Sequence, residues 1–98
     1  MTCPTTALPE AEIQSRLHAL PNWTLHDNAL ERVYHASSYL DALECLNKIA
    51  RQAETANHHP DLLLSWRTLT VRYWTHTAQG VTALDFELAQ QVERILNP

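Results

Sequence analysis

The sequence contains a single glycine, Gly80, and it has no linker, internal repeat or low-complexity stretch. Its 98 residues are therefore expected to form one domain that spans 1–98. A domain of this size buries only about 60% of the surface of its unfolded chain, so its core is modest. We expect such a small domain to associate with a second copy of itself.

Basic residues and cysteines are also scarce. Seven lysines and arginines against eleven acidic residues leave a formal net charge of −4, and the basic residues do not gather into a stripe. Direct binding to nucleic acid is not expected, because phosphate contacts require such a stripe. The two cysteines, Cys3 and Cys45, indicate neither a disulfide framework nor a metal knuckle, which is typical of a reducing compartment.

Long apolar runs are missing as well. No run approaches the ~18 residues that cross a bilayer. The polar start at residues 1–6 lacks the charged and apolar segments of a secretion signal. The sequence thus predicts a soluble, cytoplasmic protein that does not bind membranes.

Apolar residues that recur every three or four positions predict three helices. The first begins near Pro9 and ends before Pro21, the second spans about residues 39–55, and the third follows a capping pattern of Thr82 and Asp85. Runs rich in β-branched, aromatic and leucine residues predict four strands. These strands are expected at residues 23–25, 30–35, 62–66 and 69–76, with turns at 26–29, 67–68 and 79–80.

The resulting order αββαββα predicts an α+β fold. Its natural form is a four-stranded antiparallel sheet with three helices packed on one face, because each helix has one apolar stripe to bury. The opposite face would be open to a ligand or another subunit. Alternation along the last strand predicts that His76 points away from the helix-covered core.

Three of the six histidines lie in two short segments, at His58-His59 and at His76. Imidazole has an ordinary pKa of about 6.5 and exchanges protons near neutral pH, so this grouping indicates an acid/base site if the fold unites the segments. Two other interpretations stay open at this point. The pair His58-His59 also fits a solvated helix end, and the three histidines with Glu54 also fit a zinc site.

These histidines belong to a longer pattern between residues 54 and 85. It comprises Glu54-x-x-x-His58-His59-Pro60, an aromatic residue at Trp66, an alternating strand, Thr75-His76, a glycine turn and Asp85. The pattern resembles that of the pterin-4a-carbinolamine dehydratase family, and weaker agreement extends over nearly the whole chain.

The resemblance implies a hydro-lyase that converts 4a-hydroxytetrahydropterin to quinonoid dihydropterin and water during tetrahydrobiopterin recycling. It implies no cofactor and no metal ion, because the pterin is the substrate. It also implies a homodimer or homotetramer. Similar proteins act as binding modules, either for a transcription factor or in carboxylase assembly, so a protein partner is the alternative function.

The resemblance further implies roles for individual residues. His58 and His76 would form the acid/base pair around the pterin atom C4a, and His59 would position the substrate. The implied substrate-binding residues are Glu54, Pro60, Trp23, Trp74, Thr75 and Asp85. Three of these have other interpretations: Trp23 also fits core packing, Trp74 also fits an interface, and Asp85 also fits a simple helix cap.

Overall fold

The computed structural model describes residues 6–98, so the expectations about Cys3 and about residues 1–5 lie outside the described range. The order of elements confirms the predicted fold class and adds one short 3-10 helix, η1. The elements are α1 (Glu10–Leu17), β1 (Trp23–His26), β2 (Ala29–His35), α2 (Tyr39–Ala56), β3 (Asp61–Ser65), β4 (Thr68–Tyr73), η1 (His76–Ala78) and α3 (Ala83–Leu96).

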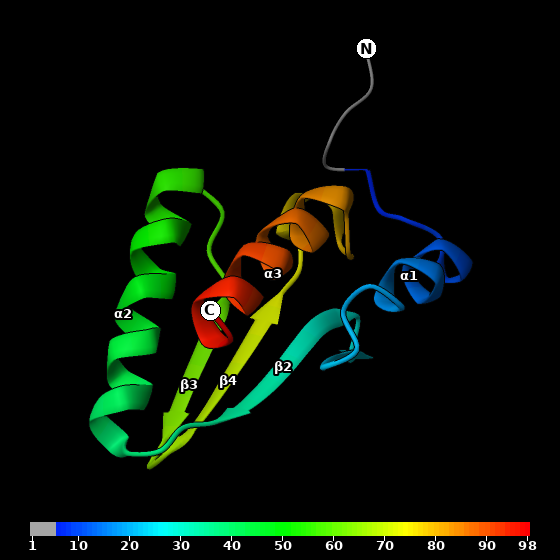
Figure 1. Ribbon diagram of the computed structural model, residues 1–98. Helices are drawn as coiled ribbons and strands as arrows, with labels where there is room; N and C mark the ends of the chain where they lie inside the picture. The colour runs from blue at the N-terminus through cyan, green and yellow to red at the C-terminus, as the bar shows by residue number, and fades with distance from the viewer. Residues whose placement is uncertain (1–5) are drawn as a thin grey trace.

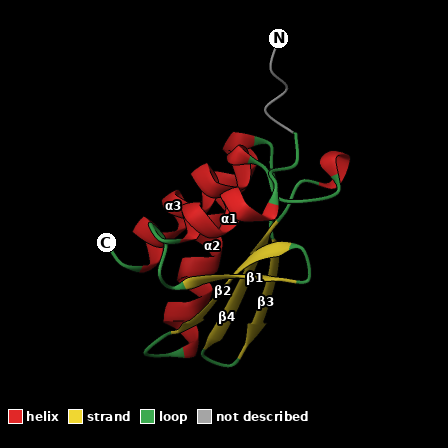
Figure 2. Ribbon diagram, turned by 90° about the vertical axis from the view of Figure 1, so that its right-hand side faces the viewer, coloured by secondary structure: helices red, strands yellow, loops and turns green. Residues whose placement is uncertain are grey.

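The four strands form one antiparallel sheet in the order β1-β2-β4-β3. Figure 1 shows α2 and α3 lying along the sheet, and the turned view in Figure 2 shows all three helices on the same side of it. The inward face of β4 carries Leu69, Val71 and Tyr73, which have no exposed surface. This is the face that alternation predicts, because successive strand residues point to opposite sides.

The last strand, β4, ends earlier than expected. A continuous strand over 69–76 was the wrong prediction, since β4 ends at Tyr73 and His76 opens η1. Thr75 instead forms an isolated bridge with Gly80. The chain therefore turns back on itself after β4, and His76 lies on a turn rather than on a sheet face.

Both hairpin turns consist of two residues: the first is shorter than the expected 26–29, and the second lies one residue before the expected 67–68. Asp27 and Asn28 both have positive φ angles, 48° and 62°, as a two-residue turn between antiparallel strands requires. In the other hairpin, Ser65 pairs with Thr68, so the turn consists of Trp66 and Arg67. Trp66, with φ 53°, was wrongly predicted to end a strand.

The open face of the sheet carries exposed apolar residues. Val33 and Leu63 flank Thr70 in one row of the register, and they are 41% and 64% exposed. The homodimer or homotetramer stays a prediction.

Within residues 6–98, no helix combines the length and the apolar character needed to cross a membrane. Cys45 is a free thiol packed against the core.

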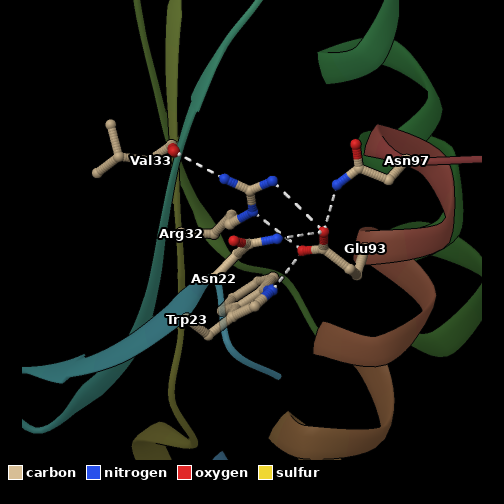
Figure 3. Close-up of polar contacts among 6 residues, drawn as sticks. All are labelled: Asn22, Trp23, Arg32, Val33, Glu93 and Asn97. Carbon is tan, nitrogen blue, oxygen red and sulfur yellow. Dashed lines mark hydrogen bonds and ion pairs between the residues drawn. The ribbon is translucent and has the colours of Figure 1, made fainter. Parts of the chain in front are cut away.

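A polar cluster joins the first hairpin to the end of α3, as Figure 3 shows. Arg32 is buried, and its Nε donates to Oε1 of Glu93 at 2.9 Å. The same oxygen accepts from Nε1 of Trp23 at 2.8 Å. The other oxygen of Glu93 accepts hydrogen bonds from the amides of Asn22 and Asn97.

These contacts determine the ionisation of Glu93. Burial raises the pKa of this carboxyl, but the hydrogen bonds, led by that from Arg32, outweigh burial and lower the pKa to about 2. The folded state therefore binds the proton less tightly than the unfolded chain does. The ionised carboxylate stabilises the fold above the usual glutamate pKa of 4.5, and this stabilisation disappears as the pH falls toward 2.

We predict that Glu93→Gln lowers the free energy of unfolding at neutral pH by about 2 kcal/mol, a value discounted from the full pKa shift because the side chain is partly solvated. The variant should also lose less stability than the wild type between pH 4.5 and pH 2. Urea denaturation followed by circular dichroism at a series of pH values measures both effects. Glu87→Gln, at an exposed position of α3, is the matched control. Parallel pH profiles for the wild type and Glu93→Gln would contradict the prediction.

Candidate active site

A cleft of about 390 Å³ opens where the end of α2, the segment after β4 and the start of α3 meet. It brings together the two histidine segments that the sequence separates. The cleft is lined by Asn57, His58, His59, Thr75, His76, Thr77 and Leu84. All three of the predicted catalytic histidines therefore lie around one cavity.

The end of α2 places the first two histidines. Asn57 takes the left-handed conformation, with φ 52° and ψ 40°. Its backbone N–H donates to the carbonyl of Glu54, and the N–H of His58 donates to the carbonyl of Ala53. This is the hydrogen-bond pattern of a Schellman motif, in which the left-handed residue reverses the chain direction. His58 and His59 thus leave the helix axis and lie beside the sheet.

His58 is paired with Asp85. Nε2 of His58 lies 2.6 Å from Oδ1 of Asp85, the His58 side chain is 13% exposed, and Asp85 has no exposed surface. The interpretation of Asp85 as a simple helix cap is therefore incomplete. It caps α3, and it also holds an imidazole in the cleft.

The remaining contacts of Asp85 assign the direction of this hydrogen bond. Oδ2 of Asp85 accepts from the hydroxyl of Thr75 at 2.8 Å and from the backbone N–H of Thr82 at 2.8 Å. These donors converge as they do on an ionised carboxylate, which can only accept hydrogen bonds. Nε2 of His58 is therefore the donor, and Nδ1 is the ring atom left to exchange a proton.

Tyr73 supports His58 from the sheet. The two rings are stacked, with centroids 5.5 Å apart and planes 16° apart, and the tyrosine hydroxyl donates to the backbone carbonyl of His58 at 3.4 Å. Burial, and next the charge of Asp85, raises the pKa of Tyr73 to about 12. The phenol therefore keeps its proton at neutral pH and continues to donate.

Glu54 is paired with His59. Nε2 of His59 lies 2.5 Å from Oε2 of Glu54, and both side chains are more than half exposed. Surface ion pairs of this kind contribute little to stability. Glu54, which the resemblance places among the substrate-binding residues, contacts the imidazole of His59 at the rim of the cleft.

His76 is held differently from the other two histidines. Its ring packs against Trp74, with centroids 4.0 Å apart and planes tilted by 37°. Within residues 6–98, neither ring nitrogen of His76 has a hydrogen-bond partner. Both nitrogens are therefore available to a ligand, and Trp74 takes part in the site through this contact.

Glu54, Trp74 and Asp85 are not among the lining residues, but each contacts a histidine that is. Trp23 and Pro60 are also not among the lining residues. Trp23 is buried in the core, where its indole nitrogen donates to Glu93 as part of the cluster in Figure 3. The structure therefore supports its interpretation as core packing within one chain. Pro60 is half-buried between the two histidines and β3, where it separates the turn from the strand.

The sequence pattern alone did not select several residues of the cleft. Asn57, Thr77 and Leu84 line it, and each of them is adjacent in sequence to a predicted residue: His58, His76 or Asp85. Adjacency to a predicted residue was thus the available signal. No feature of the sequence indicated that Tyr73 would stack on His58, because this contact joins different segments of the chain.

The three histidines and Glu54 do not converge on one point. Nε2 of His58 and Nε2 of His59 are each bonded to a different carboxylate. In the part of the chain that the structure describes, no group of three histidine, cysteine or acidic side chains has the geometry of a metal site. The pairing with separate carboxylates explains why the zinc interpretation does not fit these residues.

The fold and the cleft define a small α+β protein with three histidines around one cavity. The family model for pterin 4 alpha carbinolamine dehydratase matches residues 6–95. Relatives named for the same dehydratase are 37% identical over 90 residues in Picosynechococcus sp. PCC 7002 and 38% identical over 91 residues in Roseiflexus sp. RS-1. These matches cover 92% and 93% of this chain and 98% of each relative.

A solved structure is also similar. The crystal structure of a transcriptional coactivator/pterin dehydratase from Brucella melitensis has a TM-score of 0.89 and 29% sequence identity, and the match covers 94% of this chain and all of that one. The chain therefore belongs to the pterin 4 alpha carbinolamine dehydratase family.

We predict that Asp85→Asn lowers the free energy of unfolding by about 1 to 3 kcal/mol, because an amide offers one acceptor oxygen where donors meet both oxygens of the carboxylate. Urea denaturation at neutral pH measures the change. Asp61→Asn, at an exposed position of β3, makes the same chemical change outside the cluster and should have little effect. Equal losses in the two variants would contradict the prediction.

Proposed function

We propose that this chain dehydrates 4a-hydroxytetrahydropterins in the histidine cleft, with His58 and His76 as the acid/base pair. The observation that carries the proposal is the unequal pairing of these two histidines in one cavity: Nε2 of His58 is bonded to a buried carboxylate, whereas the ring nitrogens of His76 stay available. Membership of the family supplies the substrate class.

The reaction requires two proton transfers. The bond between C4a and the hydroxyl oxygen breaks as that oxygen takes up a proton and leaves as water. N5 gives up its proton, and the electron pair of the N–H bond forms the new double bond between N5 and C4a. One acid and one base therefore suffice, and positioned imidazoles that work near neutral pH typically accelerate such steps by about 10² to 10⁴.

His58 suits the role of base. When Nδ1 takes the proton from N5, the ring becomes positively charged, and the carboxylate of Asp85 at 2.6 Å stabilises that charge. The same contact holds the ring in one tautomer, as the aspartate of a catalytic triad does for its histidine. The ring of Tyr73 also stacks on the imidazole of His58.

His76 suits the role of acid, because no carboxylate among residues 6–98 is paired with it and the exposed residue lines the cleft. His59 lies at the rim with Glu54, where it is suited to contact the polar edge of the substrate. Leu84 offers an apolar contact to the flat ring system. The chain needs no further cofactor for this chemistry, since the pterin is the substrate.

The test is the rate of dehydration of chemically generated 4a-hydroxytetrahydropterin, followed by ultraviolet absorbance against the spontaneous reaction. We expect the wild type to accelerate the reaction and His58→Ala and His76→Ala to lose about a hundredfold or more of that acceleration. His18→Ala, an exposed histidine next to α1, is the matched control and should keep the wild-type rate.

Circular dichroism on the same samples shows that the variants are folded. Full activity in both His58→Ala and His76→Ala would contradict the assignment of the acid/base pair. A folded wild type that is no faster than the spontaneous reaction would contradict the dehydratase proposal itself, and it would favour the binding-module alternative.

A further inference from the structure

Thr75 is one of the residues that line the cleft, but it is almost completely buried. The residue is 4% exposed, and its hydroxyl donates to Oδ2 of Asp85 at 2.8 Å. A hydroxyl has one proton to donate, so this group has none left for a ligand. The hydroxyl of Thr75 therefore has a purpose other than the implied binding of the substrate.

The hydroxyls of Thr75 and Thr82 both approach the same carboxylate oxygen. Their oxygen atoms are 2.9 Å apart. The Thr75 hydroxyl donates to Oδ2 of Asp85 at 2.8 Å, and the Thr82 hydroxyl lies farther from that oxygen, at 3.3 Å. Oδ1 is left for His58. Removal of the Thr75 hydroxyl would take away the shorter of the two hydroxyl bonds to Oδ2 and also the contact with Thr82.

The backbone of Thr75 closes the turn that carries His76. The N–H of Thr75 donates to the carbonyl of Gly80 at 2.9 Å, and the N–H of Gly80 donates back at 3.3 Å. The carbonyl of Thr75 also accepts from the N–H of Ala78 at 3.1 Å. His76 is the next residue along the chain. The hydrogen bonds of Thr75 therefore determine the backbone position from which the His76 side chain extends.

We propose that Thr75 is the positioning residue for both candidate acid/base histidines of the cleft. Its hydroxyl holds the carboxylate that orients His58, and its buried side chain anchors the turn that carries His76. Its effect on turnover rests on the proposed dehydratase function. Its effect on the hydrogen bond of His58 is a property of the free protein and requires no substrate.

The experiment compares Thr75→Val, which keeps the shape and lacks the hydroxyl, with Thr75→Ser, which keeps the hydroxyl. Nuclear magnetic resonance of the free protein reports the Nε2 proton of His58, a signal assigned by its loss in His58→Gln. We expect the wild type and Thr75→Ser to show this signal, slowed in its exchange with water by the bond to Asp85. In Thr75→Val this proton should exchange with water faster, because Oδ2 of Asp85 then keeps only the backbone N–H and the longer hydroxyl contact of Thr82.

Turnover gives the second readout. Thr75→Val should reduce kcat about tenfold, the loss that corresponds to one hydrogen bond of about 1.4 kcal/mol, while KM stays within about twofold. Thr75→Ser should restore kcat. Thr70→Val removes a hydroxyl from the opposite face of β4, and it should leave both the signal and kcat unchanged.

If Thr75→Val does not fold, the pair Thr75→Ser and Thr75→Ala replaces it, because these two variants differ by one oxygen atom. Slower exchange of the His58 proton in Thr75→Ser than in Thr75→Ala supports the proposal, and equal exchange overturns it. Absence of the signal in the wild type also overturns it. The wild type could lack dehydratase activity while its His58 signal still depends on the Thr75 hydroxyl. That result would contradict the proposed function and support the positioning of His58 by Thr75.

Discussion

The cleft depends on one buried carboxylate. Asp85 has no contact with solvent, and a buried charge is costly unless hydrogen bonds replace those it made to water. Its partners come from three segments: His58 follows α2, Thr75 follows β4, and Thr82 precedes α3. These segments must meet for the charge to be satisfied. Such a cluster need not add much net stability, but it strongly disfavours arrangements in which any partner is displaced.

A second carboxylate, Glu93, acts near the other end of the same helix. It joins α3 to the first hairpin through Arg32 and Trp23, while Asp85 joins the start of α3 to the cleft. The two groups differ in purpose. The contacts of Glu93 serve the packing of helix on sheet, as Figure 3 illustrates. The contacts of Asp85 orient the imidazole of His58 in the cleft. The position of α3 relative to the sheet therefore affects the geometry of the site.

Elements were predicted well where the local sequence pattern agrees with the burial and capping that the fold imposes. The inward residues of β4 and the cap of α3 follow from alternation and from the spacing of Thr82 and Asp85. The segment after β4 was predicted wrongly, because the composition of residues 74–76 favours a strand. A strand continues only where a neighbouring strand offers hydrogen bonds, and here Thr75 finds its backbone partner in Gly80.

The sequence by itself determined the order of the elements, the inward face of each and the three histidines that identify the site. Tertiary structure alone decided which carboxylate serves which histidine. Glu54 lies one helical turn before His58 and yet pairs with His59, whereas His58 pairs with Asp85 on α3. Periodicity specifies which face of an element is buried. It does not specify which side chain of another element meets that face, because this depends on how the helices and the sheet pack together.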